Sequence, residues 1–307
     1  MIHIACNIDN NYVRHCAVML VSLFENNADE KMTVHVVENG LTPVDRKLLI
    51  DLAARYGNEA CFYKVSPQSL EGFTIRISHG RISLAAYYRC LLSDILPKNI
   101  GRVLYLDCDI VVRGSIRRLW DTPLAGKSAV VVEDMGCDED ERYRILQYPK
   151  RYSYFNSGVM LINLGYWRSH QMAQLCKDYY HTYPERIRFN DQDVLNGVMY
   201  KDKLLTDLCW NVQDGFYRNP PELTDAWKRK FAAVLKDPVI LHFTNRKPWD
   251  YDSQHPLRDE YFRYLDLTPW KGWRPTQHLG QKLKRFFRLL PFYVGLRRQK
   301  YVDLQKL

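Results

Sequence analysis

Apolar residues in the first 110 positions fall into two kinds of segment that alternate along the chain. Short runs rich in valine and isoleucine are followed by longer stretches in which apolar positions recur with helical spacing. This alternation is typical of βαβ units that build a mainly parallel sheet. Thr42 and Pro43 are a typical N-cap and first helical position. We expect strands at residues 2–6, 32–37, 61–65 and 103–106, and helices at 12–25, 43–56 and 84–96.

Further strands and helices are expected beyond residue 110. The pattern predicts strands at 128–132 and 158–162, an acidic stretch at 133–141, and helices at about 167–183 and 190–199. An apolar, β-branched run at 239–243 is expected to return to the central sheet as a late strand. The whole pattern indicates an α/β fold, with a Rossmann-like, mainly parallel central sheet flanked by helices.

Size and composition agree with one large folded unit. The chain has 307 residues, and 46 % of them are hydrophobic, which is enough to fill the core of an α/β domain. The eight cysteines form no Cys-x-x-Cys pair, so a zinc ribbon is excluded and most thiols should be buried. No run of 18 apolar residues occurs, and the polar residues close to the first apolar run are unlike a signal peptide. We therefore expect a cytoplasmic protein.

The net charge of +9 comes from one end of the chain. Residues 271–307 hold ten basic side chains and one acidic side chain, whereas residues 1–270 hold 34 of each. A basic excess confined to one end favours an appended electrostatic anchor over a diffuse surface for nucleic acid. We therefore expect no nucleic-acid partner.

The basic segment also has an amphipathic pattern. Apolar side chains recur with helical spacing at Leu279, Leu283, Phe286, Phe287 and Leu290, and the basic side chains between them are Lys282, Lys284, Arg285 and Arg288. We expect a short basic helical tail that Pro291 interrupts, with residues 275–307 lying on an anionic membrane surface. The alternative is a helix packed on the domain with its charges in water.

The strongest chemical signal is the pair Asp107 and Asp109, which ends the apolar run of RVLYLDCDIVV at residues 102–112. In an open α/β sheet, ligands bind at the carboxyl ends of strands. Side chains alternate along an extended chain, so the two carboxylates should share one side while Cys108 points to the other. Two such carboxylates can hold a divalent cation that bridges phosphate oxygens. The alternative is a turn in which the aspartates only cap loop amides.

Three further motifs follow this pair in order, namely FNSGVMLINL (155–164), NDQDVLNG (190–197) and HFTNRKPW (242–249). With YLDCDIVV they make the sequence resemble glycosyltransferase family 8 over about residues 2–250. Within that family it is most similar to bacterial lipopolysaccharide and lipooligosaccharide α-galactosyltransferases and glucosyltransferases. The resemblance implies a GT-A fold, a UDP-galactose or UDP-glucose donor, retention at the anomeric carbon, and a saccharide or glycolipid acceptor.

The resemblance also implies a division of the chain. A GT-A catalytic domain would span residues 1–270. Within it, residues 1–112 would bind the nucleotide sugar, and residues 113–270 would bind the acceptor and complete the metal site. The charge and amphipathic pattern of the last residues, and not the resemblance, adds a basic membrane-association tail at residues 271–307.

A Mn²⁺ ion is a further implication, with Mg²⁺ as an alternative. Asp107, Asp109 and His242 match the family's metal ligands, and an imidazole beside two carboxylates suits Mn²⁺ better than Mg²⁺. Such a cation would stabilise the negative charge that develops on the departing UDP. Lys247 matches a lysine that contacts the diphosphate. Arg89 matches an arginine near the donor sugar and phosphates, and we count it among the catalytic candidates.

The first strand and turn, ACNIDNNY, match the uridine-binding segment of the family, although one extra residue precedes the tyrosine. Asp9, Asn10 and Tyr12 are the candidates there, because carboxylate and amide groups can bind uracil and ribose and a tyrosine ring can stack. The alternative, without a binding role, is an Asx-rich turn that enters a helix.

For the sugar, Asp134, Asn156, Asp191 and Gln192 resemble hydroxyl-binding and reaction-face residues. Carboxylates accept hydrogen bonds, and amides both donate and accept them, so together they can read hydroxyl orientation. Gln192 corresponds to a glutamine near the anomeric carbon. An amide is a poor nucleophile, so we favour front-face substitution, in which the departing phosphate takes the acceptor's proton. Asp191 as a nucleophile is the alternative.

Two other enzymatic interpretations remain open. A strand that ends in D-x-D-x-V also begins haloacid-dehalogenase-like phosphatases, in which the first aspartate is the nucleophile and the second the acid-base, although here two βαβ units precede the motif. Glycogenin-like self-glucosylation is the other. The lipid-directed tail favours an acceptor in a membrane instead, and hence an enzyme peripheral to the inner face of the cytoplasmic membrane.

Overall fold

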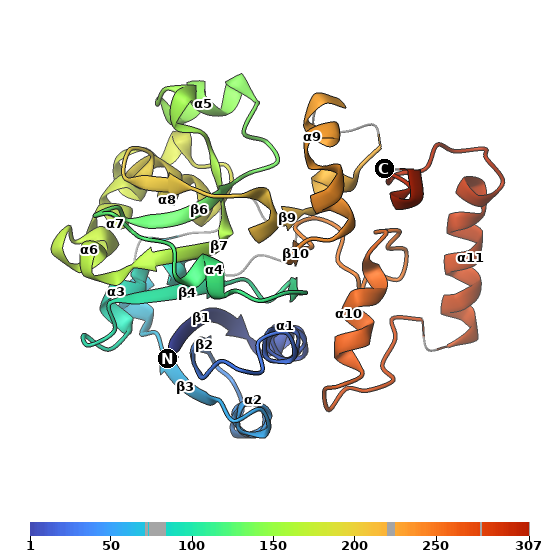
Figure 1. Ribbon diagram of the computed structural model, residues 1–307, viewed down its shortest axis with the longest axis horizontal. Coiled ribbons are helices and arrows are strands. Elements are labelled where there is room, and N and C mark those ends of the chain that lie inside the picture. The colour runs from blue at the N-terminus through green and yellow to red at the C-terminus, as the bar shows by residue number, and fades with distance from the viewer. Residues whose placement is uncertain (71–72, 74–83, 220–224, 277, 307) are drawn as a thin grey trace.

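The central element of the computed structural model is one sheet, and the structure describes residues 1–70, 73, 84–219, 225–276 and 278–306. Among these residues seven strands pair in the order β3-β2-β1-β4-β7-β6-β8 (Figure 1). They are β1 (Ile2–Asp9), β2 (Met32–Asn39), β3 (Glu59–Lys64), β4 (Arg102–Leu106), β6 (Ala129–Glu133), β7 (Phe155–Asn163) and β8 (Lys203–Leu205). Only β7 runs antiparallel to its neighbours, β4 and β6. The expected mainly parallel sheet is confirmed.

Helices cover both faces of the sheet, and the strand alternation sorts the core between them. Leu104 and Leu106 pack in the cluster that includes α1 (Val13–Glu25) and α2 (Pro43–Arg55). Val103 and Tyr105 point to the other face, which α3 (Leu92–Ile95), α6 (Leu164–Ser169), α7 (Met172–Thr182) and α8 (Asn190–Met199) cover. The helix α2 begins as expected, because the Thr42 hydroxyl accepts a hydrogen bond from the Asp45 amide and Pro43 follows.

The remaining helices surround these layers. They are α4 (Arg117–Trp120), α5 (Asp140–Leu146), α9 (Asp225–Lys236), α10 (Arg258–Leu265) and α11 (Leu279–Tyr293). Short 3-10 turns are η1 (Asn10–Tyr12), η2 (Pro67–Leu70), η3 (Leu84–Leu91), η4 (Lys150–Tyr152), η5 (Pro184–Arg186), η6 (Leu208–Trp210), η7 (Asp214–Tyr217) and η8 (Leu304–Lys306).

Two expected helices differ from the structure. The segment expected as one helix at 84–96 is mostly the 3-10 turn η3, followed by the single turn α3. Its consecutive residues 87–93 are all buried, and so long a buried run does not fit the one apolar face of an amphipathic α-helix. The helix expected at 167–183 is divided into α6 and α7, because Gln171 between them has a φ of +52°.

The late strand expected at 239–243 forms, but it does not return to the central sheet. Residues Ile240–His242 are β10 of a separate three-stranded sheet with β5 (Ile110–Val112) and β9 (Val212–Gln213). The expectation was wrong because the chain resumes an extended course directly after Asp109. The extended residues after Asp109 form β5, and β10 pairs antiparallel with β5 instead of joining the central sheet.

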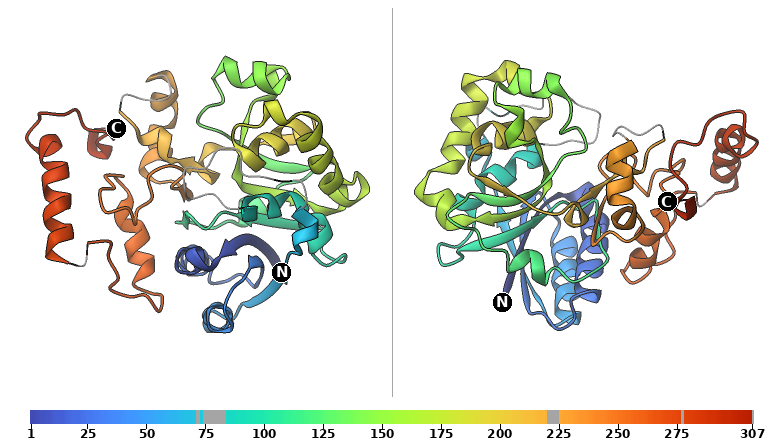
Figure 2. Two further views of the ribbon diagram at one scale, coloured as in Figure 1. Left: turned by 180° about the vertical axis from the view of Figure 1, so that it is seen from behind. Right: turned by 45° about the horizontal axis from the view of Figure 1, so that its top comes forward.

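The C-terminal segment lies to one side of the domain, with α11 outermost (Figures 1 and 2). The helix continues through Pro291 to Tyr293, so the expected interruption was wrong. Pro291 has no N–H to donate to the Phe287 carbonyl one turn earlier, so the helix passes through it with one hydrogen bond fewer. Beyond the helix, Tyr301 is buried and donates a hydrogen bond to Asp214, so the end of the chain returns to the domain. Within the described residues, no helix has the length and apolar character needed to cross a bilayer.

Candidate active site

Two carboxylates and an imidazole meet at the carboxyl end of β4. One ligand atom from each of Asp107, Asp109 and His242 lies within 4.8 Å of the other two. His242 Nε2 is 3.1 Å from Asp109 Oδ1 and 3.8 Å from Asp107 Oδ2. His242 arrives there because β10 pairs antiparallel with β5, which places it opposite Ile110. Residues 133 positions apart in the sequence are thus brought to one point.

Local features of this cluster fit a metal ion. Asp109 Oδ1 is buried, and it faces His242 Nε2 at 3.1 Å, so two ligand atoms are directed at the same point. Gly158 forms the adjoining wall, and a Cβ atom there would lie only 2.7 Å from Asp107 Oδ2 and 2.9 Å from His242 Nδ1. Two carboxylates and one imidazole are ligands that suit a first-row divalent cation such as Mn²⁺. The residues present therefore fit the ion that the sequence implies.

Lys247 lies against the same cluster. Its ammonium group forms an ion pair with Asp109 and donates hydrogen bonds to the carbonyls of Phe243 (2.6 Å) and Thr244 (3.1 Å). Burial opposes the charge of Asp109, but Lys247 and His242 hold the pKa of that carboxyl well below its usual range. Asp109 is therefore ionised at neutral pH, as a metal ligand must be.

Arg89 joins the metal cluster to a third carboxylate, that of Asp191. Its guanidinium is 2.8 Å from Asp107 Oδ1 and 3.0 Å from Asp191 Oδ2, and it donates to the Ser157 carbonyl at 2.9 Å. Burial opposes its charge, but Asp107 and Asp191 raise the pKa of Arg89 well above its ordinary value. Burial raises the pKa of Asp191 to about 6, because Arg89 is shared with Asp107 and offsets only part of the desolvation.

Beside Asp191, the expected sugar-binding residues form one hydrogen-bonded group. The Gln192 amide donates to Asp134 Oδ2 (3.1 Å) and accepts from Asn156 Nδ2 (3.0 Å), and Asn156 Nδ2 also lies 3.2 Å from Asp134 Oδ2. Gln192 donates further to the Tyr154 hydroxyl and accepts from the Ser157 amide, both at 3.1 Å. Its side chain is therefore held in one orientation by four neighbours.

The expected uridine-binding residues lie at the same edge of the sheet. Because β1 and β4 are parallel neighbours, with Ala5 paired with Tyr105, the strand ends that carry Asp9 and Asp107 lie at one edge of the sheet. Asp9 caps η1 by accepting from the Asn11 amide, and Asn10 donates to the Gly40 carbonyl at 2.8 Å. The Tyr12 ring lies edge-on to Trp249, with 6.2 Å between ring centroids. The Asx-rich turn therefore forms as expected, and it lies at the same edge of the sheet as the metal-ligand candidates.

Sequence reasoning missed two residues that orient the metal ligands. The Tyr105 hydroxyl donates to Asp107 Oδ1 at 2.8 Å, and strand alternation two residues before Asp107 is a signal that could have found it. Asn211 is fully buried; its Nδ2 donates to Asn156 Oδ1 and its Oδ1 accepts from His242 Nδ1, both at 2.9 Å. No local pattern marks Asn211. It links the His242 ligand to the amide group around Gln192.

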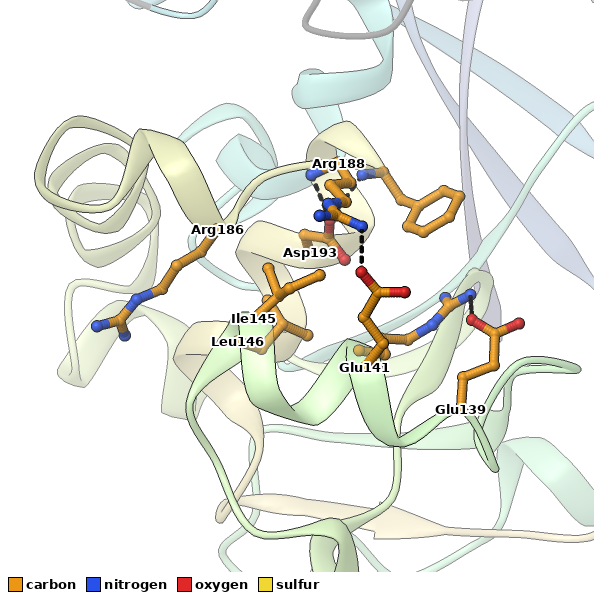
Figure 3. A pocket seen from close by; sticks show the side chains of 9 residues that line it. Glu139, Glu141, Ile145, Leu146, Arg186, Arg188 and Asp193 are labelled. Carbon is orange, nitrogen blue, oxygen red and sulfur yellow. Dashed lines mark hydrogen bonds and ion pairs between the residues drawn. The ribbon is translucent and has the colours of Figure 1, made fainter.

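A small depression of about 100 Å³ lies between α5 and the start of α8, next to this group (Figure 3). Arg142 is largely buried at its edge, 3.4 Å from Asp134 Oδ1 and with its guanidinium over the Phe189 ring. In Figure 3 Arg188 points toward Glu141, while Arg186 points away from the depression. Phe189 is half-exposed, so an aromatic ring is open to solvent beside the sugar-binding candidates.

Comparison with known proteins assigns this architecture. The sequence model described as "Glycosyl transferase family 8" matches residues 3–253. General stress protein A of Bacillus subtilis (strain 168) is 31 % identical over 278 residues, covering 88 % of this chain and 95 % of that protein. Lipopolysaccharide 1,2-glucosyltransferase of Escherichia coli is 27 % identical over 276 residues, covering 88 % and 79 %. The crystal structure of the galactosyltransferase LgtC with donor and acceptor sugar analogs has a TM-score of 0.77 at 25 % identity, covering 87 % of this chain and 96 % of that one.

Proposed function

The chain belongs to glycosyl transferase family 8 and is a glycosyltransferase related to those of lipopolysaccharide synthesis, and we propose that it is a retaining hexosyltransferase. It moves galactose or glucose from a UDP-sugar to a saccharide acceptor, the oligosaccharide of a lipopolysaccharide or another glycolipid. The convergence of Asp107, Asp109 and His242 supports this most strongly, because this set suits a metal-assisted departure of a diphosphate. Family membership argues against the phosphatase alternative.

Asp107, Asp109 and His242 would hold Mn²⁺, with Mg²⁺ as a weaker fit to the imidazole. A bound cation supplies positive charge at the β-phosphate as UDP departs. Lys247 adds a compact positive charge next to Asp109, where it can contact the same diphosphate. Asp9, Asn10 and Tyr12, at the neighbouring strand end, would bind the uridine.

The sugar would lie between the metal cluster and the group of Asp134, Asn156 and Gln192. The fixed Gln192 amide would present a dipole to the anomeric carbon, where positive charge develops. Asp191 is less suited to a nucleophilic role, because its Oδ2 is bonded to Arg89 and to the Ser157 hydroxyl at 3.1 Å. We therefore favour front-face substitution, with Arg89 positioning Asp107 and Asp191.

The depression at Phe189 is our candidate for the acceptor sugar. An exposed aromatic ring can stack on the apolar face of a hexose, and the carboxylates and guanidinium groups around it can bind hydroxyls (Figure 3). Arg142 joins this surface to Asp134 and so to the donor side. Phe189→Ala should raise the KM for the acceptor and leave the KM for the donor unchanged.

The deciding experiment incubates the protein with Mn²⁺ and a panel of nucleotide sugars and follows nucleotide release. We expect release with UDP-galactose or UDP-glucose, loss of release with EDTA, and less than about 1 % of it in Asp107→Asn and Asp109→Asn. Asp51→Asn, on an exposed face of α2, is the matched control and should retain full activity. Turnover that chelation does not change would contradict the proposal.

We also propose that α11 rests on an anionic membrane, at the inner face of the cytoplasmic membrane. Its apolar positions Leu279, Leu283, Phe286 and Phe287 are all exposed, and four basic side chains alternate with them on the same helix. Aromatic and basic side chains on one amphipathic helix are typical of interfacial binding to anionic lipid. This placement would bring the active site to an acceptor in the lipid surface.

Point substitutions test this better than truncation, because Tyr301 packs on the domain and a truncated chain would lose that contact. Leu283→Glu should reduce co-sedimentation with vesicles of anionic phospholipid. The control is Leu205→Glu on β8, because the two leucines have similar exposure, 48 % and 45 %. Equal vesicle binding by both variants and the wild type would contradict the membrane role.

A further inference from the structure

Three free cysteines form a buried cluster behind the turn that carries Asp107 and Asp109. Cys6 lies in β1, Cys16 in α1, and Cys108 between the two aspartates. One sulfur from each lies within 4.8 Å of the other two, and the Sγ atoms of Cys6 and Cys16 are 3.8 Å apart. Alternation along the chain sends Cys108 into the core beneath α1, away from the carboxylates on either side of it.

The spacing of these sulfurs matches that of a thiolate metal site. Thiolates bind zinc at about 2.3 Å, so three sulfurs around one ion are about 3.8 Å apart in a tetrahedral site and about 4.0 Å apart in a trigonal one. The observed separations of 3.8 Å and at most 4.8 Å need shifts of less than about 1 Å to reach either geometry. The cluster is therefore largely formed before an ion binds.

The surroundings select the kind of ion. Cys6 and Cys16 are fully buried and Cys108 nearly so, among apolar side chains of the same core. The Cys108 thiol donates a hydrogen bond to the Asn7 carbonyl oxygen at 3.6 Å. Sulfur ligands favour soft ions such as zinc, cadmium or copper(I), whereas manganese prefers oxygen and nitrogen.

We propose that Cys6, Cys16 and Cys108 form a second metal site, for a soft divalent cation of the zinc and cadmium class. Each thiol releases its proton as its sulfur binds the ion. The two sites lie back to back on residues 107–109 and differ in ligand softness, so they select different ions. An ion held by Cys108 would restrain the turn that presents both carboxylates.

Cadmium binding to the reduced, metal-free full chain tests the site. Titration with Cd²⁺ alone, followed by ultraviolet thiolate-to-metal charge-transfer absorbance, should saturate at one ion per chain. A large excess of Mn²⁺ should not displace this ion, because all three proposed ligands are soft thiolates. Displacement by Mn²⁺, or no charge-transfer absorbance, would overturn the proposal. Neither result depends on the transferase proposal, which the nucleotide-release assay tests separately.

Variants locate the site. Cys16→Ala should weaken Cd²⁺ binding by more than about tenfold, whereas Cys176→Ala should leave it unchanged. Cys176 is an equally buried thiol, but it lies in α7 on the opposite face of the sheet. X-ray absorption of the cadmium-loaded wild type supplies a test that does not depend on a variant folding. Three sulfur neighbours support the site; fewer than three, or equal binding by Cys16→Ala and the wild type, would overturn it.

Discussion

Replacing Gly158 by alanine places a methyl group between two of the metal-ligand candidates. Gly158 lies in β7, and its carbonyl accepts a hydrogen bond from the Asp107 amide at 2.9 Å. A Cβ atom there would be 2.7 Å from Asp107 Oδ2 and 2.9 Å from His242 Nδ1, with the Cε1 atom of the same ring nearer still. Both side chains would have to move outward together.

The size of this movement follows from the contact distances. Ordinary contacts of Cβ atoms begin at 3.4 Å, so Asp107 Oδ2 would have to retreat from 2.7 Å by about 0.7 Å. Metal–ligand distances tolerate changes of only about 0.2 Å. We therefore expect Mn²⁺ affinity to fall by about 10- to 100-fold. Overpacking should also lower the free energy of unfolding by about 1–3 kcal/mol.

Calorimetric titration of metal-free protein with Mn²⁺ measures the affinity, and urea unfolding measures the stability. Gly101→Ala is the matched control, because Gly101 directly precedes β4 and a Cβ placed there has no heavy atom within 4 Å among the described residues beyond its chain neighbours. The control should bind Mn²⁺ as the wild type does. A folded Gly158→Ala protein with wild-type Mn²⁺ affinity would refute the assignment of Asp107 and His242 as joint ligands.

Two further predictions concern the buried hydrogen bonds and the response to acid. Asn211→Leu removes the acceptor of His242 Nδ1 and one of the two donors to Asn156 Oδ1, the Gly158 amide being the other, so Mn²⁺ affinity in calorimetry should fall about 10-fold or more. Unchanged affinity would show that Asn211 does not orient the ligand. Burial lowers the pKa of His15 to about 3 and those of His35 and His255 to about 4. The unfolded chain therefore binds protons near pH 6.5 that the folded chain excludes, and stability is lost as the pH falls from 6.5 toward 4. Between pH 7 and pH 5 we expect each histidine to lower the free energy of unfolding by about 2 kcal/mol, while the raised pKa of Asp191 opposes this by about 1 kcal/mol. Urea unfolding at both pH values measures the difference, and equal stability would contradict the histidine assignment.

Local sequence patterns correctly predicted the elements whose formation depends only on residues close together in the chain. The short segments expected as strands became β1 to β4, and the Thr42-Pro43 start became α2, because alternation and capping depend on near neighbours. The incorrect predictions concern elements whose course depends on residues far away in the chain. The course of β10 depends on the edge that β5 offers, and the 3-10 turn η3 depends on burial from several sides.

By itself, the sequence determined the βαβ order, the position of Asp107 and Asp109 at a strand end, and the charged, amphipathic character of residues 271–307. Only the tertiary structure decided that His242 reaches the two carboxylates, that Asn211 orients it, and that three cysteines gather behind them. The physical reason is that these contacts join residues tens to more than a hundred positions apart. Periodicity and capping act within a few residues, whereas such contacts depend on how strands pair and helices pack.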